Sequence, residues 1–324
     1  MNRANYLAPS IILPVLMIIL GFILPDWMRY LFTVALSKAF VVLGVVILLR
    51  AGLVSFGHAL FFAAAAYAVA FSANLWGIRE AFVLIILGVL ASLALAAIIG
   101  ILVARYREIF FAMITLAFSM ALFGMLVKAY SFTGGTDGLH IPSPTIFGFH
   151  FAPEVSTIAK YYLTLFCLAI VVYLINRFVN SPFGYILQAI KENEIRVSYM
   201  GGSVSKAIYL TFILSGGLAG LGGSLITFNV GHIDPYLSYW TTSGEFVFVA
   251  LLSGTSNVFA CIGGSIFVEF IKTYAFKYAP YTWQMALGGI MLVVILFSPG
   301  GLWALWEKLM QGTKMGGKKH DVTT

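Results

Sequence analysis

Long apolar runs dominate this chain of 324 residues and decide what it can fold into. A run of about 20 apolar residues can cross the hydrocarbon core of a membrane as an α-helix, which satisfies every backbone hydrogen bond internally. Ten runs are predicted to do so: 8–24, 31–49, 54–73, 81–103, 109–129, 160–179, 205–228, 243–256, 258–276 and 283–298. The eighth is short and ends in polar residues, so it fits a half-helix as well as a full crossing. The sequence predicts an all-α integral membrane protein, with residues 1–324 as one domain.

Composition excludes the main alternatives. The chain is 61% hydrophobic and only 10% charged, whereas soluble domains carry about 25% charged residues. The runs do not alternate between apolar and polar residues, as the strands of a membrane β-barrel would. The net charge of +7 comes with no basic patch interleaved with aromatic residues, so we predict no nucleic-acid partner. Cys167 and Cys261 each lie in an apolar run and predict neither a disulfide nor a metal site.

Basic residues predict the orientation, because cytoplasmic loops are enriched in lysine and arginine. If 181–204 is cytoplasmic, ten spans place both termini inside, with twelve basic residues on that side and seven outside. The loop 131–159 contains no lysine or arginine and is predicted to be external. Five spans precede this loop and five follow it. Two related five-helix halves would therefore have inverted topologies, as in many transporters.

One polar segment, 181–202, interrupts the apolar chain. Ser181 and Pro182 predict a helix N-terminus, and the Gly201-Gly202 pair predicts its end. Ile186, Ile190 and Val197 can share one face of this amphipathic helix. An amphipathic helix outside the membrane is expected to contact a partner.

Of two glycine patterns, one is present in the chain and the other is absent. The spacing of Gly216, Gly220 and Ser224 predicts a close contact between helices. No GxxxxGK[ST] string occurs, so the chain is not expected to bind ATP through a P-loop.

Ionisable residues within membrane spans are candidates for function. Lys272 lies one turn from Glu269, which predicts a structural ion pair, and Lys38 is predicted to extend toward the membrane surface. His58 could line a solute path or cap a helix, and Glu245 could line a path or be reached by water. The string 133–139 could be a structural turn or an external contact surface. No catalytic or metal-binding set stands out, so we do not expect an enzyme.

Several strings resemble permeases of branched-chain amino acid ABC importers, on the LivM side of the permease pair. They are Ser55-Phe-Gly-His-Ala-Leu-Phe-Phe62, Ala66-Tyr67, Thr115-Leu-Ala-Phe118, Thr133-Gly-Gly-Thr-Asp-Gly-Leu139, Ser181-Pro-Phe-Gly184, Ala189-Ile-Lys-Glu-Asn-Glu194 and Ser298-Pro-Gly-Gly-Leu302. The chain departs from the pattern after the Thr115 string, where relatives often carry an acidic residue and Ser119-Met120 stands here.

The resemblance implies a permease subunit of the bacterial cytoplasmic membrane that carries a branched-chain amino acid, urea or an amide. Its implied partners are a second related permease, forming a heterodimer, two ATPase subunits that hold ATP and magnesium, and an external or periplasmic substrate-binding protein. Segment 181–202 would be the ATPase-coupling helix, and the residues expected to act there are Ile186, Ala189, Ile190, Lys191, Glu192, Asn193 and Glu194. His58, Thr115 and Glu245 are the expected path residues. The alternative is a transporter driven by an ion gradient, with Glu245, Glu269 or His58 as the coupling site.

Overall fold

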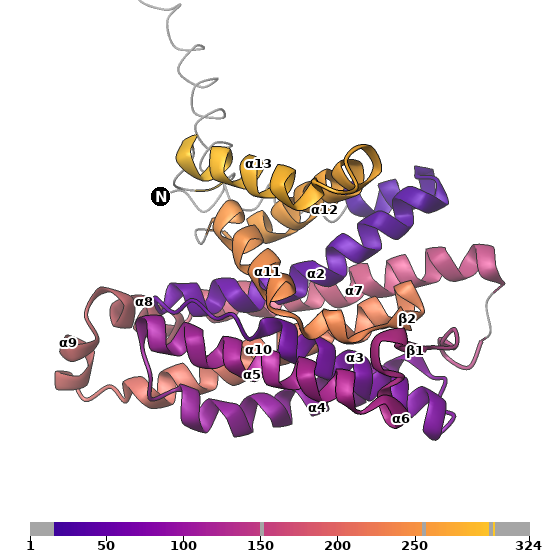
Figure 1. The fold of residues 1–324 in the computed structure, drawn as a ribbon. Coiled ribbons are helices and arrows are strands. Elements are labelled where there is room, and N and C mark those ends of the chain that lie inside the picture. Colours follow the sequence, from indigo (N-terminus) through magenta and orange to yellow (C-terminus); the bar gives the residue numbers. More distant parts are fainter. Residues whose placement is uncertain (1–15, 150–151, 255–256, 298–300, 302–324) are drawn as a thin grey trace, which may run out of the picture.

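Helices make up most of the part of the chain that the computed structural model describes, which is 16–149, 152–254, 257–297 and residue 301 (Figure 1). Seven described helices are long and apolar enough to cross a membrane. They are α2 (Asp26–Arg50), α3 (His58–Leu75), α4 (Ala81–Val103), α5 (Glu108–Lys128), α7 (Pro153–Val179), α10 (Val204–Val230) and α12 (Val258–Tyr278). The prediction of an all-α membrane protein is confirmed.

The predicted number of ten spans is not confirmed. Helix α11 (Trp240–Ser253) has 14 residues, and at 1.5 Å per residue it extends about 21 Å, less than the roughly 30 Å hydrocarbon core. Helix α13 (Trp283–Phe297) has 15 residues and borders residues outside the described part. The first predicted span is described only from residue 16, and 16–23 are helical.

Helix α10 lies at the centre and packs against α2, α3 and α4 (Figure 1). Its small residues let the neighbouring backbones approach closely. A Cβ atom added at Gly216 would lie 2.6 Å from the Cβ of Ala96 on α4. Gly220 faces Ser92, and Ser224 faces Gly88, one and two turns further along the same contact. The three residues predicted to mediate helix packing therefore lie together at the α4–α10 interface.

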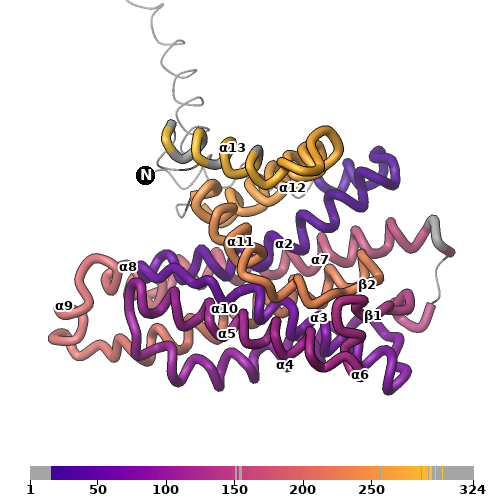
Figure 2. The backbone as a smooth tube through the Cα atoms, in the orientation of Figure 1, coloured from indigo at the N-terminus to yellow at the C-terminus, as the bar shows by residue number. Residues whose placement is uncertain are grey.

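A second layer lies on the α2 side of this core. Helices α11 and α12 pack against α2, and α13 packs on α11 and α12 (Figure 2). Helix α7 also packs along α2. Among the described side chains, α2 is almost entirely buried from Leu31 to Arg50, because neighbours cover it from several sides.

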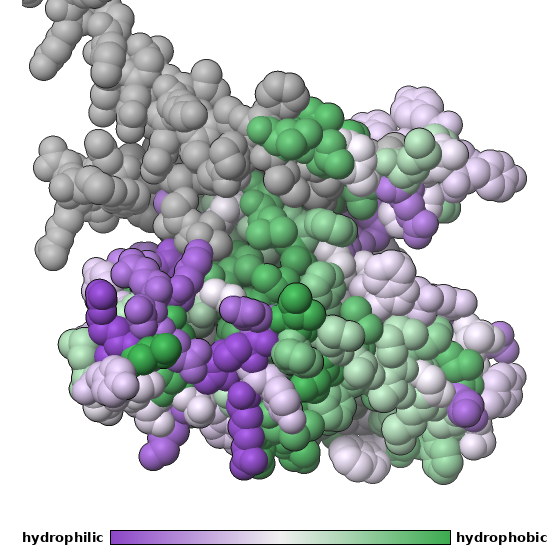
Figure 3. Space-filling model, turned by 60° about the vertical axis from the view of Figure 1, so that its left-hand side comes forward, coloured by the Kyte–Doolittle hydropathy of each residue, from purple (hydrophilic) through white to green (hydrophobic). Residues whose placement is uncertain are grey.

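The predicted cytoplasmic segment and the predicted external loop lie at opposite ends of the bundle (Figure 1). One end carries α8 (Pro182–Glu192) and α9 (Glu194–Tyr199). The other carries the short elements α6 (Tyr130–Thr133), η1 (Gly135–Asp137), β1 (Leu139–His140), β2 (His232–Ile233) and η2 (Pro235–Ser238). Strands β1 and β2 are antiparallel, with Leu139 opposite Ile233. Hydrophilic side chains gather at the α8–α9 end, beside a mainly hydrophobic flank (Figure 3).

The string 133–139 supports this small sheet. Gly138 has a φ of +71°, and a Cβ atom there would collide with the carbonyl oxygen of Ile233. Only glycine adopts this conformation readily beside another backbone. The string is therefore a structural turn that brings β1 onto β2.

Glu80 holds a second loop at the same end. Its carboxylate accepts hydrogen bonds from the backbone N–H groups of Phe147 at 2.8 Å and Gly148 at 3.0 Å, and from the hydroxyl of Thr145 at 3.1 Å. These donors stabilise the charged form, so the pKa of Glu80 lies below its ordinary value, chiefly through the bond from Gly148. Glu80 thus fixes residues 145–148 to the start of α4.

Candidate functional site

Helix α3 begins midway along the bundle rather than at its end. The first residue of α3, His58, is fully buried, and its Nε2 lies 2.6 Å from the hydroxyl oxygen of Ser215 near the middle of α10. The Ser215 hydroxyl donates its proton to the carbonyl of Gly44 on α2 at 2.7 Å. Ser215 therefore accepts from His58, whose Nε2 must carry a proton. His58 ties α3 to α2 and α10 and has no exposed surface, so it does not line an open path in this conformation.

Helix α11 begins at the same depth. The hydroxyl of Ser243, in its first turn, accepts a hydrogen bond from the backbone N–H of Ala59 in the first turn of α3 at 3.0 Å. Just before α11, the carbonyl of Ser238 accepts a bond from the Ser119 hydroxyl at 2.8 Å. The N-termini of α3 and α11 therefore meet inside the bundle. A connecting segment leads back to this depth before each helix: 51–57 before α3 and 231–239 before α11.

Helix α5 holds both of these helix starts. The hydroxyl of Thr115 accepts a hydrogen bond from the backbone N–H of Phe56 at 3.2 Å, and Ser119 lies one turn further along. Both side chains are buried, on a helix whose only other buried residues are Phe111 and Leu126. We call the set Phe56, Thr115, Ser119, Ser238 and Ser243 the mid-depth junction.

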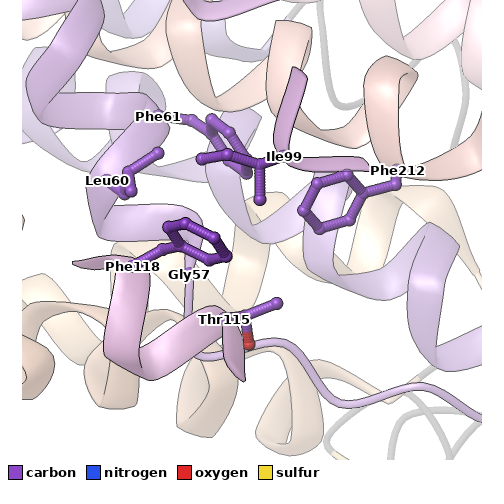
Figure 4. Close-up of a pocket in the computed structure, with 7 residues that line it drawn as sticks. All are labelled: Gly57, Leu60, Phe61, Ile99, Thr115, Phe118 and Phe212. Carbon is purple, nitrogen blue, oxygen red and sulfur yellow. The ribbon is translucent and has the colours of Figure 1, made fainter. Parts of the chain in front are cut away.

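A small pocket adjoins the mid-depth junction (Figure 4). Thr115 and Gly57 form its polar side, and apolar side chains from α3, α4, α5 and α10 close the rest. The lining residues are Gly57, Leu60, Phe61, Ile99, Thr115, Phe118 and Phe212. The pocket is too narrow to admit a water molecule. Its walls come from α3, α4, α5 and α10, so its width depends on how these four helices pack.

Four charged residues form a cluster between α2, α11 and α12, which we call the charge cluster. The ammonium of Lys38 lies 2.9 Å from Glu245 and 2.7 Å from Glu269, and that of Lys272 lies 2.8 Å from Glu245. The predicted pair of Glu269 with Lys272 is wrong, because the packing of α12 against α2 places Glu269 beside Lys38 instead. The predicted extension of Lys38 to the surface is also wrong, since two carboxylates hold it in place. Glu245 is paired twice and mostly buried, so it does not face an open path.

The α8–α9 segment differs from its predicted surface. Ser181 caps α8 as expected, accepting a hydrogen bond from the N–H of Gly184 at 3.4 Å. Ile186 is exposed, but Ile190 is 5% exposed and packs inward, so the two do not form one docking face. A break at Asn193 separates α8 from α9. The exposed members of the predicted coupling set are Ile186, Ala189, Lys191, Glu192 and Asn193, while Glu194 pairs with Arg107 at 2.8 Å.

Sequence reasoning missed the serines of this site. Ser215 and Ser243 each lie in an apolar run, and a lone serine there usually bonds to its own helix. Only Ser119 gave a signal, because it stands where relatives of the resembled family often carry an acidic residue. The string at 298–302 lies mostly outside the described residues. Within the described part, no cluster of histidine, cysteine and acidic residues is placed to hold a metal ion.

Comparison with known proteins gives the family. The family model described as "Branched-chain amino acid transport system / permease component" matches residues 28–296. The chain is 26% identical to the high-affinity branched-chain amino acid transport system permease protein LivM of Escherichia coli over 87% of this chain and 72% of that protein. It is 28% identical to the probable branched-chain amino acid transport permease protein LivM of Methanocaldococcus jannaschii, over 65% of this chain and 67% of that protein.

A probable LivH permease of the same archaeon is also 28% identical, over 70% of this chain and 75% of that protein. No solved structure matches. The family model covers most of the chain, including every residue of the mid-depth junction and of the charge cluster. This chain belongs to the family of permease components of branched-chain amino acid transport systems.

Proposed function

We propose that this chain is the permease subunit of an ABC importer that carries a branched-chain amino acid, or a similarly small polar solute such as urea or an amide, into the cytoplasm. It would act in the bacterial cytoplasmic membrane with a second related permease, two ATPases that bind ATP and magnesium, and an external binding protein. The family and the names of the relatives support transport by a permease. The observation that carries the proposal for the path is the pair of helices, α3 and α11, that start midway through the bundle.

Helix starts at mid-depth suit a transport path for a polar solute. The first N–H groups of a helix have no partner within it, and the helix dipole places partial positive charge there. Broken helices at the bilayer midplane are a recurring feature of transporter binding sites. Here the hydroxyls of Thr115, Ser119 and Ser243 lie beside the α3 and α11 starts. The solute would pass beside Thr115 once the narrow pocket opens.

The same arrangement supports two inverted halves. Helix α3 follows α2, and α11 follows α10, each after a returning segment. Gly44 lies against Ser215 and Ser37 against Gly222, so α2 and α10 run antiparallel. Helices α3 and α11, which both begin at mid-depth, thus follow two helices that run antiparallel to each other, as inverted repeats require. Each half would contribute one helix start to the path.

Segment 181–202 would receive the ATPases on the cytoplasmic side. Its large exposed apolar side chains are Tyr185, Ile186, Ile195, Tyr199 and Met200. Residues of this kind form the buried centre of protein–protein interfaces. Ile195 of α9 replaces Ile190 as the second isoleucine offered to a partner.

Among the described residues, the three candidates for coupling to an ion gradient are all bonded within the chain. Glu245 and Glu269 are both bonded to lysines, and the four charges of the cluster cancel. His58 is enclosed by α2 and α10. A residue that binds a coupling ion must be reachable from the solvent during the cycle, and these three are held by partners within the chain.

The test is solute uptake into proteoliposomes that contain the complete complex. Leucine, isoleucine, valine, urea and acetamide would be offered as labelled solutes, each with the binding protein. Uptake should require ATP and should stop when both ATPases carry a substitution that blocks hydrolysis. Uptake that continues with the inactive ATPases, and that an ionophore abolishes, would overturn the proposal in favour of an ion-driven transporter.

A further inference from the structure

We infer that the ion pair between Arg107 and Glu194 transmits movement of the α8–α9 segment to helix α5, and through α5 to the mid-depth junction. The inference rests on the proposed function, because it assigns to this pair the link between the ATPase-docking segment and the solute path. It makes Arg107 and Glu194 positioning residues, which act through α5 rather than by touching the solute.

Arg107 joins three parts of the chain at the α8–α9 end. Its Nε donates to the carboxylate of Glu194 on α9 at 2.8 Å. Its Nη1 donates to the carbonyls of Ala104, the C-cap of α4, and of Tyr106. A guanidinium can hold these acceptors at once because its donors form a rigid planar fork. Since α5 begins at the next residue, any displacement of Glu194 reaches the start of α5 through a single side chain.

The start of α5 is strained in a way that permits a pivot. Glu108, the first residue of α5, has a φ of +49°. A residue with a side chain is strained in this region and stays there only when surrounding contacts hold it. Arg107 supplies contacts immediately before this residue. Loss or movement of the Arg107 bonds would let the backbone relax at Glu108 and swing α5.

Helix α5 buries few of its side chains within this chain. Most of its side chains are exposed or half-buried, and a Cβ atom added at Gly124 would have no neighbour within 4 Å. Its polar ties to the bundle are the bonds of Thr115 to the Phe56 N–H and of Ser119 to the Ser238 carbonyl. Few buried contacts within the chain therefore oppose a displacement of α5.

The consequence is one continuous mechanical connection. Glu194 moves with the docked ATPase, Arg107 follows Glu194, and α5 pivots at Glu108. Thr115 and Ser119 then displace the starts of α3 and α11 together, because each holds one of them. The same movement shifts Phe118 and Thr115 away from Phe212 and widens the narrow pocket.

The first test measures coupling in proteoliposomes that contain the complete complex. Arg107→Glu and Glu194→Arg should each lower the solute imported per ATP hydrolysed by about fivefold, the upper range for a partly exposed ion pair. The ATPases should still co-purify with both variants. The double variant Arg107→Glu/Glu194→Arg restores the pair with exchanged charges and should return the ratio to within about twofold of the original. Arg105→Glu makes the same charge change at an exposed position of the same loop and should have no effect.

A second measurement does not depend on the solute. Spin labels at position 121 on α5 and position 210 on α10, in a chain whose Cys167 and Cys261 are replaced by serine, report the distance between the two helices. Both labelled positions are exposed. Trapping the ATPases in their ATP-bound state should change this distance in the original chain and in the double variant, but not in either single variant.

Three results would overturn the inference. One is a double variant as impaired as the single variants, which would mean that Glu194 contacts the ATPase directly. The second is an unchanged transport ratio in both single variants. The third is a distance between α5 and α10 that does not respond to the nucleotide in the original chain although ATP-dependent uptake is intact. Failure of the proposed function is distinguishable, because uptake by the original complex would then not depend on ATP.

Discussion

The ammonium nitrogen of Lys38 lies 2.9 Å from a carboxylate oxygen of Glu245, although 207 positions separate the two residues along the chain. Lys38 is near the middle of α2, and Glu245 is in the second turn of the broken helix α11. Glu269 and Lys272 of α12 complete the charge cluster, so two positive and two negative charges cancel. This cluster fastens α11 and α12 to the central layer at the depth where α11 begins.

Removing one charge of this cluster should destabilise the protein strongly. In Lys38→Met, Glu269 loses the lysine that pairs with it, and Glu245 keeps only Lys272. Breaking a buried pair typically costs about 3–5 kcal/mol. Thermal unfolding in detergent should therefore show a lower midpoint for Lys38→Met than for Lys277→Met, which changes an exposed lysine of α12. The double variant Lys38→Met/Glu269→Gln restores neutrality and should recover part of the loss. A midpoint for Lys38→Met equal to that of Lys277→Met would contradict this role.

Thr115→Val should weaken the mid-depth junction while keeping the side-chain shape. The substitution removes the acceptor for the Phe56 N–H, and an unsatisfied buried donor costs about 1–3 kcal/mol. We expect a lower unfolding midpoint and reduced uptake, because the start of α3 is no longer held to α5. Met113→Ala, at an exposed position of the same helix, is the matched control. Equal uptake and stability in the two variants would show that the Thr115 bond is dispensable.

Gly216→Ala should separate α10 from α4. The new methyl group would lie 2.6 Å from the Cβ of Ala96, well inside the 3.5–4.0 Å of a favourable carbon contact. Overpacking of this kind typically costs about 1–3 kcal/mol. The double variant Gly216→Ala/Ala96→Gly makes room for the methyl group and should be more stable than Gly216→Ala alone. Gly263→Ala adds its methyl group to open space on α12, so a similar loss of stability there would point to a general effect of alanine.

The loop at 145–148 should loosen in acid. The pKa of Glu80 is lowered by hydrogen bonds to its charged form, so its contribution to stability is complete above the ordinary glutamate pKa of about 4.3. The contribution is lost as the pH falls from that value through the lowered pKa, because protonation removes the acceptor charge. The protection factors of the Phe147 and Gly148 amides against hydrogen exchange should fall in this range. In Glu80→Ala the same amides should exchange fast already at neutral pH, and slow exchange there would contradict the assignment.

Features that depend on neighbouring residues were predictable from the sequence. The apolar runs gave the long helices, because a helix satisfies its backbone hydrogen bonds within the run itself. The Ser181 cap and the closely packed Gly216 series were also readable, since each depends on a spacing of three or four residues. The distribution of lysine and arginine separated segment 181–202 from loop 131–159, and the structure places them at opposite ends of the bundle.

Partners distant in the chain were decided only by the tertiary structure. Proximity in the sequence predicted an ion pair of Glu269 with Lys272, whereas the packing of α2 against α12 forms an ion pair of Glu269 with Lys38. Periodicity placed Ile186 and Ile190 on one face but could not say that Ile190 turns inward. The apolar run at 54–73 concealed a helix that starts at mid-depth, because the partners of its first turn, Ser215 and Ser243, lie more than 150 positions away. A sequence specifies local hydrogen bonds and the length of a span, whereas the packing of the helices determines which buried polar groups meet.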